Sequence, residues 1–290
     1  MTRPRLLSGI GALAGCFAGF LLDQWGVLHD GERPLPGARE AVDALLAQGA
    51  RIVLLSNSGR RAATNRERLA ALGFPPERLA GIVTSGEATW RLLKERPGPP
   101  WSELGRRCLL LTIGGDLGPV EGLDLELVEA PEDADFLLVS GLDGKPAEAW
   151  RPLAEAARAR DLPMICSNPD KLAPSPTGFL DSPGRLAAIY ESLGGRVVYV
   201  GKPHAPIYTA CLEALAGIPR DAILAVGDSL EHDVAGAHAQ GLATCLVASG
   251  IHAEELPVEG EADQLIDAVE RLAARMDAPP PDFVVRHFRW

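Results

Sequence analysis

No part of this sequence concentrates positive charge: 39 acidic residues outnumber 28 basic ones, which gives a formal net charge of −11. A protein that binds nucleic acid in general needs clustered Lys and Arg side chains, because these neutralise the phosphates. The sequence also contains no internal repeat and no low-complexity tract. The acidic net charge and the lack of clustered positive charge argue against a nucleic-acid partner.

Cysteine is scarce and scattered. The five cysteines are odd in number and lie mostly inside apolar segments: Cys16, Cys108, Cys166, Cys211 and Cys245. A secreted disulfide scaffold has an even number of cysteines in a tight pattern. We therefore expect reduced thiols that pack in the core of a cytoplasmic protein.

One long stretch without charge runs from Leu6 to Leu22, after two arginines, and it resembles a signal peptide or a membrane span. The stretch is rich in glycine, short for a bilayer and without a clear cleavage site. It also runs directly into a predicted strand that ends at Asp23. We therefore expect no membrane association.

Hydrophobic residues make up 47 % of the 290 residues, enough for a sizeable core in one large or two modest domains. Apolar runs such as Phe20–Leu22 and the four residues that follow Arg51 in Arg51–Leu55 indicate parallel strands that are covered on both faces. Helical periods, for example over 37–48, separate these runs. The alternation predicts an α/β fold built on a Rossmann-like, doubly wound parallel sheet.

The middle of the chain has a strand and helix alternation of its own. A Pro- and Gly-rich segment at 97–101 marks a boundary, and strands are expected again over 108–113 and 135–140. We expect residues 86–172 to form an inserted α/β domain, and residues 1–85 and 173–290 to form the core domain.

Polar groups follow four of the predicted strands: Asp23, Ser56, Lys202 and Asp228, with Asp233 five residues further on. A parallel sheet brings the carboxyl ends of its strands to one edge, so we expect these side chains to meet. Carboxylates suit Mg²⁺, Lys and Ser suit phosphate oxygens, and an aspartate can form an aspartyl-phosphate. Taken alone, Asp23 could instead cap a turn, and the loop at 56–58 could be an ordinary helix cap.

The order of these motifs is similar to that of the haloacid dehalogenase superfamily, whose phosphatases use an aspartate nucleophile. The motifs are DxxGVL at 23–28, SNS at 56–58, GKP at 201–203 and GDSLxxD at 227–233. The insert, together with Pro36-Gly37-Ala38 and Asn168-Pro169-Asp170, resembles the class IIA branch. That branch includes the 4-nitrophenylphosphatase-like enzymes and phosphatases of nucleotide or sugar phosphates. The resemblance covers roughly residues 17–252.

The resemblance implies a role for each matching residue. Asp23 would be the nucleophile and a Mg²⁺ ligand, together with the backbone carbonyl of Trp25 and the carboxylates of Asp228 and Asp233. Phosphate would be bound by Ser56 and Lys202. Substrate contacts are expected from four further residues: Asn57, Ser58, Trp25 and Asp143. The insert would be a cap that closes over a small phosphorylated metabolite, and a homodimer is expected by analogy.

One position departs from the family pattern. The phosphatases carry a second Asp two residues after the nucleophile, which protonates the leaving group, and this chain has Trp25 there. An indole N–H cannot shuttle a proton, so turnover should fall by roughly a hundred- to ten-thousand-fold unless His29 or Asp30 substitutes. Trp25 is either a core anchor beside the site or an aromatic wall for the substrate.

Three functions are therefore open on the sequence alone. The first is Mg²⁺-dependent hydrolysis of a small phosphomonoester, of the sugar or nucleotide phosphate type, through an aspartyl-phosphate. The second is a degenerate member that binds a phosphorylated metabolite as a sensor or partner module. The third is phosphoryl transfer to an acceptor. Retention of all five strand-end residues favours an enzyme over a binding module.

Overall fold

The computed structural model describes residues 3–175 and 178–290. The chain divides into two compact units. Unit 1 comprises Met1–Ser56, Asn65–Val83 and Tyr208–Trp290, and unit 2 comprises Asn57–Thr64 and Thr84–Ile207. The chain therefore leaves unit 1 and returns to it twice.

Unit 1 is built on a seven-stranded sheet with the order β1-β14-β13-β12-β2-β3-β4. All strands from β1 to β3 in this order pair in parallel. The strands are β1 (Arg5–Leu7), β2 (Gly19–Leu22), β3 (Arg51–Ser56), β4 (Gly81–Thr84), β12 (Ile223–Gly227), β13 (Ala243–Val247) and β14 (Phe283–Val285). All four residues of β2 are buried, as expected for a central strand covered on both faces.

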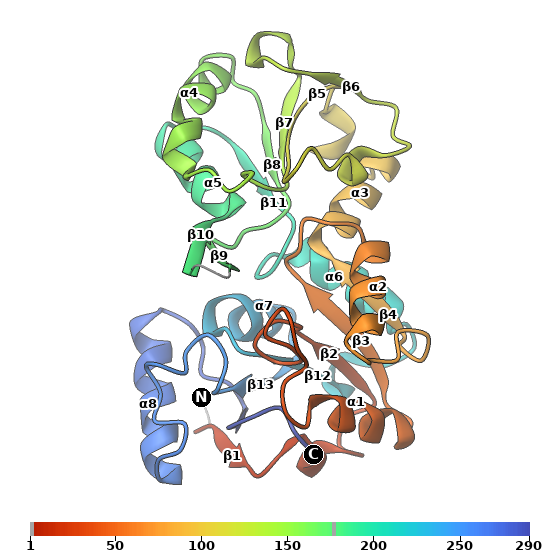
Figure 1. Cartoon of the computed structure of the whole chain (residues 1–290), viewed down its shortest axis with the longest axis vertical. Helices are drawn as coiled ribbons and strands as arrows, with labels where there is room; N and C mark the ends of the chain where they lie inside the picture. The colour runs from red at the N-terminus through yellow and green to blue at the C-terminus, as the bar shows by residue number, and fades with distance from the viewer. Residues whose placement is uncertain (1–2, 176–177) are drawn as a thin grey trace. The chain divides into compact units, whose positions relative to one another are not determined.

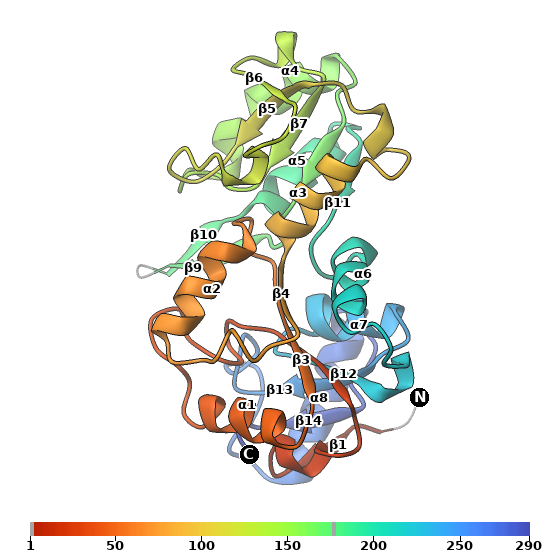
Figure 2. The ribbon, with the colours of Figure 1, turned by 90° about the vertical axis from the view of Figure 1, so that its right-hand side faces the viewer.

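Helices cover both faces of this sheet. One face packs against α1 (Ala38–Ala47) through Ala41, Val42 and Leu45, and the other packs against α8 (Ala262–Arg275). Figure 2 shows α1 in front of the sheet and α8 behind it. The remaining helices that contribute to unit 1 are α2 (Ala62–Ala71), α6 (Ala205–Ala214), α7 (Ala235–Ala239) and the short helices Ile10–Leu13, Arg220–Ala222 and Leu230–Val234. The doubly wound architecture expected from the sequence is confirmed.

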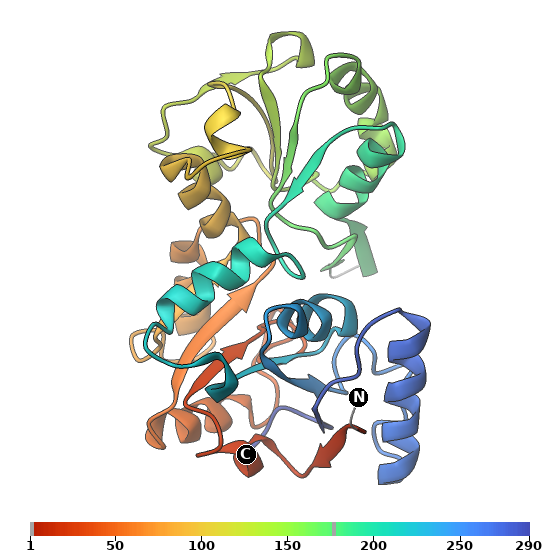
Figure 3. The same cartoon turned by 180° about the vertical axis from the view of Figure 1, so that it is seen from behind.

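The two ends of the chain form neighbouring strands. β1 pairs with β14, and β14 also pairs with β13, so the C-terminal tail lies inside the sheet (Figure 3). The apolar stretch from Leu6 to Leu22 is divided between β1, a short helix and β2. Among residues 3–175 and 178–290, none of the helices combines the length and the apolar character that crossing a bilayer would require.

Unit 2 contains a five-stranded parallel sheet with the order β11-β8-β7-β5-β6, and a hairpin of β9 with β10. Its strands are β5 (Arg107–Leu111), β6 (Glu126–Val128), β7 (Phe136–Val139), β8 (Met164–Cys166), β9 (Leu172–Ser175), β10 (Gly178–Asp181) and β11 (Val197–Tyr199). Figure 1 shows α4 (Arg151–Ala159) and α5 (Pro183–Ser192) together along one side of the sheet and α3 (Ser85–Glu95) along the other. Short helices span Trp101–Glu103, Gly118–Val120, Pro131–Asp133 and Ala147–Trp150.

The boundary of the second unit differs from the sequence-based expectation. Unit 2 continues to Ile207, whereas the insert was expected to end at residue 172. The reason is that β11 pairs with β8, and the buried residues of α5, including Leu186 and Tyr190, pack in the core of this sheet. Lys202 therefore follows a strand of the five-stranded sheet. The expectation that Lys202 and Asp23 end strands of one sheet is wrong.

All five cysteines are free thiols, and all lie within the described residues. Cys16 is exposed and the other four are buried. Burial raises the pKa of the Cys108 and Cys245 thiols to about 12, so these side chains pack as uncharged apolar groups. The expectation of core cysteines is confirmed for the four buried residues and is wrong for Cys16, which is exposed.

Candidate active site

Three carboxylates converge at the carboxyl edge of the unit 1 sheet. Asp23 follows β2 and Asp228 follows β12, and these strands are neighbours with Leu22 opposite Val226. Asp233 lies in the short helix that comes next, Leu230–Val234. One oxygen from each carboxylate lies within 4.8 Å of the others, and all three residues are buried. The sequence placed these acids at strand ends, and the structure brings them together.

Backbone groups hold two of these acids in place. The Ile251 N–H donates to Asp228 Oδ2 at 2.8 Å, and the Ser229 N–H donates to Asp233 Oδ2 at 3.1 Å. The Tyr208 hydroxyl donates to the Asp233 carbonyl and so fixes the helix that carries this acid. These bonds orient the carboxylates before any ligand arrives.

Glycine backbone passes directly against the same acids. A Cβ added at Gly26 would overlap the Asp228 carboxylate, as would one at Gly250, and a Cβ at Gly227 would overlap Asp233. Gly26 also has φ +77°, a left-handed conformation that favours glycine. The three glycines therefore leave the space in which the carboxylates lie.

The donor set suits a divalent cation. Negative charge on carboxylates within 4.8 Å of one another is repulsive, and a cation between them would offset this repulsion. Their oxygens are the hard ligands that Mg²⁺ prefers, since it binds through a few carboxylates and keeps several waters. The residues present thus fit a metal centre formed by Asp23, Asp228 and Asp233. A contribution from the Trp25 carbonyl stays a prediction.

The loop after Asp23 is closed by its own side chains. The Trp25 indole Nε1–H donates to the Asp30 carbonyl at 3.1 Å, and the Gly31 N–H donates to His29 Nδ1 at 3.1 Å. The Asp30 carboxylate accepts from the Glu32 and Arg33 N–H groups at 2.9 and 2.8 Å. Of the two interpretations of Trp25, these contacts favour an anchor.

Neither proposed substitute for the missing Asp is suited to donate a proton at neutral pH. Burial, with a contribution from Arg68, lowers the pKa of His29 to about 4, although Asp30 opposes the shift. Hydrogen bonds from the N–H groups of Arg33 and Glu32 hold the pKa of Asp30 below its usual value. At pH 7 His29 is therefore neutral and Asp30 is ionised.

A second cluster lies in unit 2, around Lys202. Asn57 Nδ2 donates to Asp170 Oδ1 at 2.7 Å and to the Lys202 carbonyl at 3.1 Å, and Asn57 Oδ1 accepts from the Lys202 N–H at 2.6 Å. The side chains of Asn57 and Lys202 are buried. Asn57 was expected to contact substrate, but its amide binds the Lys202 backbone and Asp170. It therefore acts on the position of Lys202.

The other predicted residues have local contacts. Ser56 ends β3 in unit 1 and is bonded to Asn57, the first residue of unit 2. Ser58 Oγ accepts from the Arg60 N–H at 3.3 Å. Asp143, which was expected to contact substrate, has φ +52°, and its Oδ1 accepts from the Gly114 N–H at 2.8 Å, which links the loops after β5 and β7.

The alternative interpretation of the Ser56–Ser58 loop was that it caps the following helix. The first helical residue of α2 is Ala62, and its N–H donates to Glu87 Oε2 at 3.1 Å. Arg61 holds this carboxylate through a further hydrogen bond at 2.7 Å. A carboxylate from α3 thus accepts the first N–H of α2.

Two supporting groups, one in each unit, were not found from the sequence. Asp170 was used only as a mark of the family branch, and its contact with Asn57 spans 113 positions. The turn at Gly250-Ile251 holds Asp228 but carries no chemically distinctive side chain. The small residues that follow β13, Ser249-Gly250, were the only local signal for this turn.

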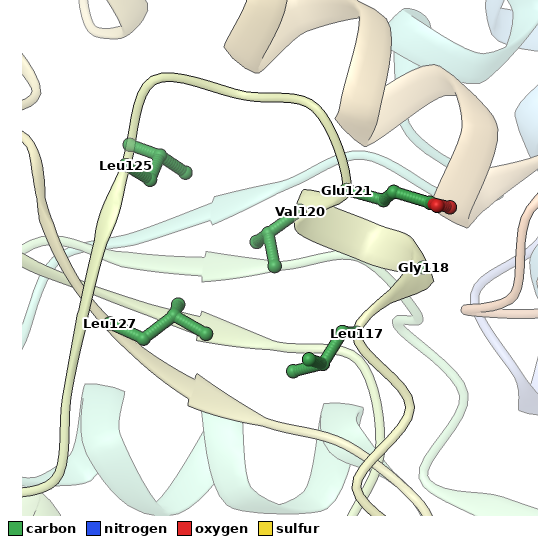
Figure 4. A pocket seen from close by; sticks show the side chains of 6 residues that line it. All are labelled: Leu117, Gly118, Val120, Glu121, Leu125 and Leu127. Carbon is green, nitrogen blue, oxygen red and sulfur yellow. The ribbon is translucent and has the colours of Figure 1, made fainter.

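Unit 2 also contains a cavity of about 410 Å³ whose lining includes none of Asn57, Asp170 and Lys202. It is lined by Leu117, Gly118, Val120, Glu121, Leu125 and Leu127. Figure 4 shows the leucine and valine side chains directed toward one space, with the Glu121 carboxylate pointing away. This cavity offers no cation for a phosphate, so we do not assign it to the active site.

A doubly wound parallel sheet with three carboxylates at its carboxyl edge places the chain among α/β proteins with a candidate metal site. The chain belongs to the haloacid dehalogenase-like hydrolase family. Models described as haloacid dehalogenase-like hydrolase match residues 20–126 and 101–241, and a HAD-hydrolase-like model matches residues 199–289. The family expected from the motifs is thereby confirmed.

Individual proteins agree with this assignment. Chronophin from Rattus norvegicus is 30 % identical over 91 % of this chain and 90 % of its own length. Sugar-phosphatase AraL from Bacillus subtilis is 30 % identical over 80 % of this chain and 84 % of its own. A haloacid dehalogenase-like hydrolase from Brucella suis has a TM-score of 0.81 at 30 % identity, over 97 % of this chain and 99 % of that one.

Proposed function

We propose that the chain is a Mg²⁺-dependent phosphatase that hydrolyses a small phosphorylated metabolite through an aspartyl-phosphate at Asp23. The observation that carries this proposal is the cluster of Asp23, Asp228 and Asp233 at the edge of the sheet. A module that only binds an anionic ligand would gain nothing from three buried carboxylates. A hydrolase uses one as nucleophile and two as metal ligands.

We assign each residue a separate task. The Asp23 carboxylate attacks phosphorus, and the bond from phosphorus to the leaving-group oxygen breaks. The Lys202 ammonium and the Ser56 hydroxyl bind phosphate oxygens, and Asn57 positions the Lys202 backbone. When bound, the cation supplies charge neutralisation at the phosphoryl oxygens. Water then attacks the aspartyl-phosphate and releases inorganic phosphate.

The family resemblance and the relative named as a sugar-phosphatase support a sugar or nucleotide phosphate as substrate. One specific observation favours a second candidate, a sensor that binds a phosphorylated metabolite without turnover. It is the presence of Trp25, whose indole is bonded to Asp30, where the family carries an acid. Phosphoryl transfer to an acceptor stays a third alternative.

The test measures phosphate release from 4-nitrophenyl phosphate, with MgCl₂ or with EDTA. We expect turnover that requires Mg²⁺ and falls by at least a thousandfold in Asp23→Asn, which keeps shape but removes the nucleophile. The matched control is Asp43→Asn, because Asp43 is an exposed carboxylate on α1 whose ion pair with Arg78 lies on the surface. Equal activity in wild type and Asp23→Asn would reject the mechanism.

A further inference from the structure

The loop from Gln24 to Pro34, here called the Trp25 loop, holds three groups that bear on proton donation: Trp25, which replaces the family's acid, and its two possible substitutes, His29 and Asp30. A general acid matters because an alkoxide is a poor leaving group unless it is protonated as it departs. Donation by a positioned acid contributes roughly a hundred- to ten-thousand-fold to such a step. The hydrogen bonds of the loop decide whether any of the three can donate.

The only hydrogen-bond donor of the Trp25 indole already has an acceptor. Its single donor, Nε1–H, is bonded to the Asp30 carbonyl at 3.1 Å. An indole has no second polar atom, and its N–H is too weakly acidic to act as a general acid at neutral pH. The position that carries the acid in related phosphatases therefore serves here to close the loop.

Asp30 and His29 are committed as acceptors. Asp30 Oδ1 receives two backbone N–H groups at 2.9 and 2.8 Å, as in an Asx turn, which fixes the carboxylate as an acceptor. His29 Nδ1 accepts from the Gly31 N–H, so that nitrogen carries no proton. The other ring nitrogen, Nε2, is buried without a hydrogen-bond partner in the described structure, sealed from solvent. His29 Nδ1 and Asp30 Oδ1 are therefore both engaged as acceptors from the backbone of the loop.

We infer that this site acts on phosphorylated compounds whose leaving group departs as a stabilised anion, namely aryl or acyl phosphates, and discriminates against alkyl phosphates. This inference rests on the proposed function, because it concerns the leaving group of the same Asp23 reaction. It departs from the sugar or nucleotide phosphate that the resemblance supports, since those esters release an alcohol, and the leaving-group series below decides between the two. It gives the Trp25 loop a role in specificity, because the loop supplies no acid that protonates the leaving group.

The chemistry balances without a donated proton. An Asp23 oxygen forms a bond to phosphorus, and the leaving oxygen takes the bonding electron pair and departs as a phenolate or a carboxylate. The conjugate acids of these anions have pKa values of about 10 and about 4, far below that of an alcohol. Water then attacks phosphorus and Asp23 leaves as a carboxylate, itself a stabilised anion. The proton of the water goes to bulk solvent.

The test is a leaving-group series with wild-type protein and Mg²⁺. We measure kcat/KM for acetyl phosphate, 4-nitrophenyl phosphate, phenyl phosphate and glycerol 3-phosphate. We expect a steep fall along the series, with glycerol 3-phosphate at least a thousandfold below 4-nitrophenyl phosphate. This measurement needs no variant. Comparable rates for the alkyl and the nitrophenyl esters would overturn the inference while leaving the aspartyl-phosphate mechanism in place.

Two variants assign the effect to the loop. Trp25→Asp installs the acid, and Trp25→Asn is its matched control, which removes the indole without adding an acid. We expect Trp25→Asp to raise kcat/KM for glycerol 3-phosphate relative to 4-nitrophenyl phosphate by about a hundredfold or more, and Trp25→Asn to leave this ratio unchanged. An equal change in both variants would overturn the inference. No turnover of any compound, acetyl phosphate included, would reject the proposed function itself.

Discussion

At the scale of single residues, Asn57 was expected to contact substrate, but its side chain instead bonds to neighbouring protein groups. Its amide makes three hydrogen bonds inside unit 2, two with the Lys202 backbone and one with Asp170. Buried polar groups of this kind are costly to leave unpaired, at about 1–3 kcal/mol each. Asn57 therefore fixes the turn that presents Lys202, and its influence on phosphate binding is indirect.

A charge exchange tests this role. Asn57→Asp places a carboxylate 2.7 Å from Asp170, so repulsion should loosen the Lys202 turn and raise KM about tenfold or more. The double variant Asn57→Asp with Asp170→Asn restores one donor and one acceptor at this contact. We expect it to recover much of the lost affinity, as measured by KM and by melting temperature. Asp43→Asn is the control, since Asp43 is an exposed carboxylate on α1 of unit 1. An unchanged KM in Asn57→Asp would contradict the role.

The sequence predicted the acidic residues better than it predicted their supports. Asp23 and Asp228 follow apolar runs, and parallel strands place such residues at one edge, so local pattern was sufficient. Asp170 lies 113 positions from Asn57, and no local pattern carries a contact over that separation. The identity of a reacting group is often visible in the chain, whereas the groups that hold it depend on tertiary structure.

At the scale of elements, long helices and central strands were predicted within about two residues, because their apolar periods are strong. The elements that were missed are short. β1 and β14 have three residues each, and the β9–β10 hairpin lies between a helix and a loop. β11 was predicted as a strand but placed in the wrong sheet. Its apolar sequence suits either sheet, so only pairing with β8 decides.

The backbone of the Trp25 loop gives a test at this scale. Gly26→Ala forces a Cβ onto the Asp228 carboxylate and strains a φ of +77°. We expect activity to fall at least a hundredfold and the stabilisation by Mg²⁺, seen as a rise in melting temperature, to be lost. Gly49→Ala is a matched control, because Gly49 has φ +83° with nothing near the added Cβ. It should lose about 1 kcal/mol of stability and keep its activity. Equal losses in both variants would show that strain alone is responsible.

At the scale of the whole molecule, two histidines of unit 1 couple stability to pH. His29 and His252 are both buried, and burial is the main reason that the pKa of each lies below its usual value. In the unfolded chain a histidine binds a proton near pH 6.5. The folded state resists protonation at these positions, so unfolding takes up protons as the solution becomes acidic.

The sign and size follow for His29, whose folded pKa is about 4. Above pH 6.5 the histidine is neutral in both the folded and the unfolded state, so it does not change the free energy of unfolding. As the pH falls from 6.5 to 4, the free energy of unfolding decreases by about 3 kcal/mol in total. His29→Asn keeps an acceptor for the Gly31 N–H but does not titrate. Thermal melts between pH 7 and pH 4 should therefore show a smaller decrease in melting temperature for His29→Asn than for wild type. His238→Asn, which changes an exposed histidine on α7, should follow the wild-type curve. Parallel curves for wild type and His29→Asn would contradict this prediction. They would mean that the folded protein protonates His29 as readily as the unfolded chain does, although Nε2 is buried without a hydrogen-bond partner in the described structure.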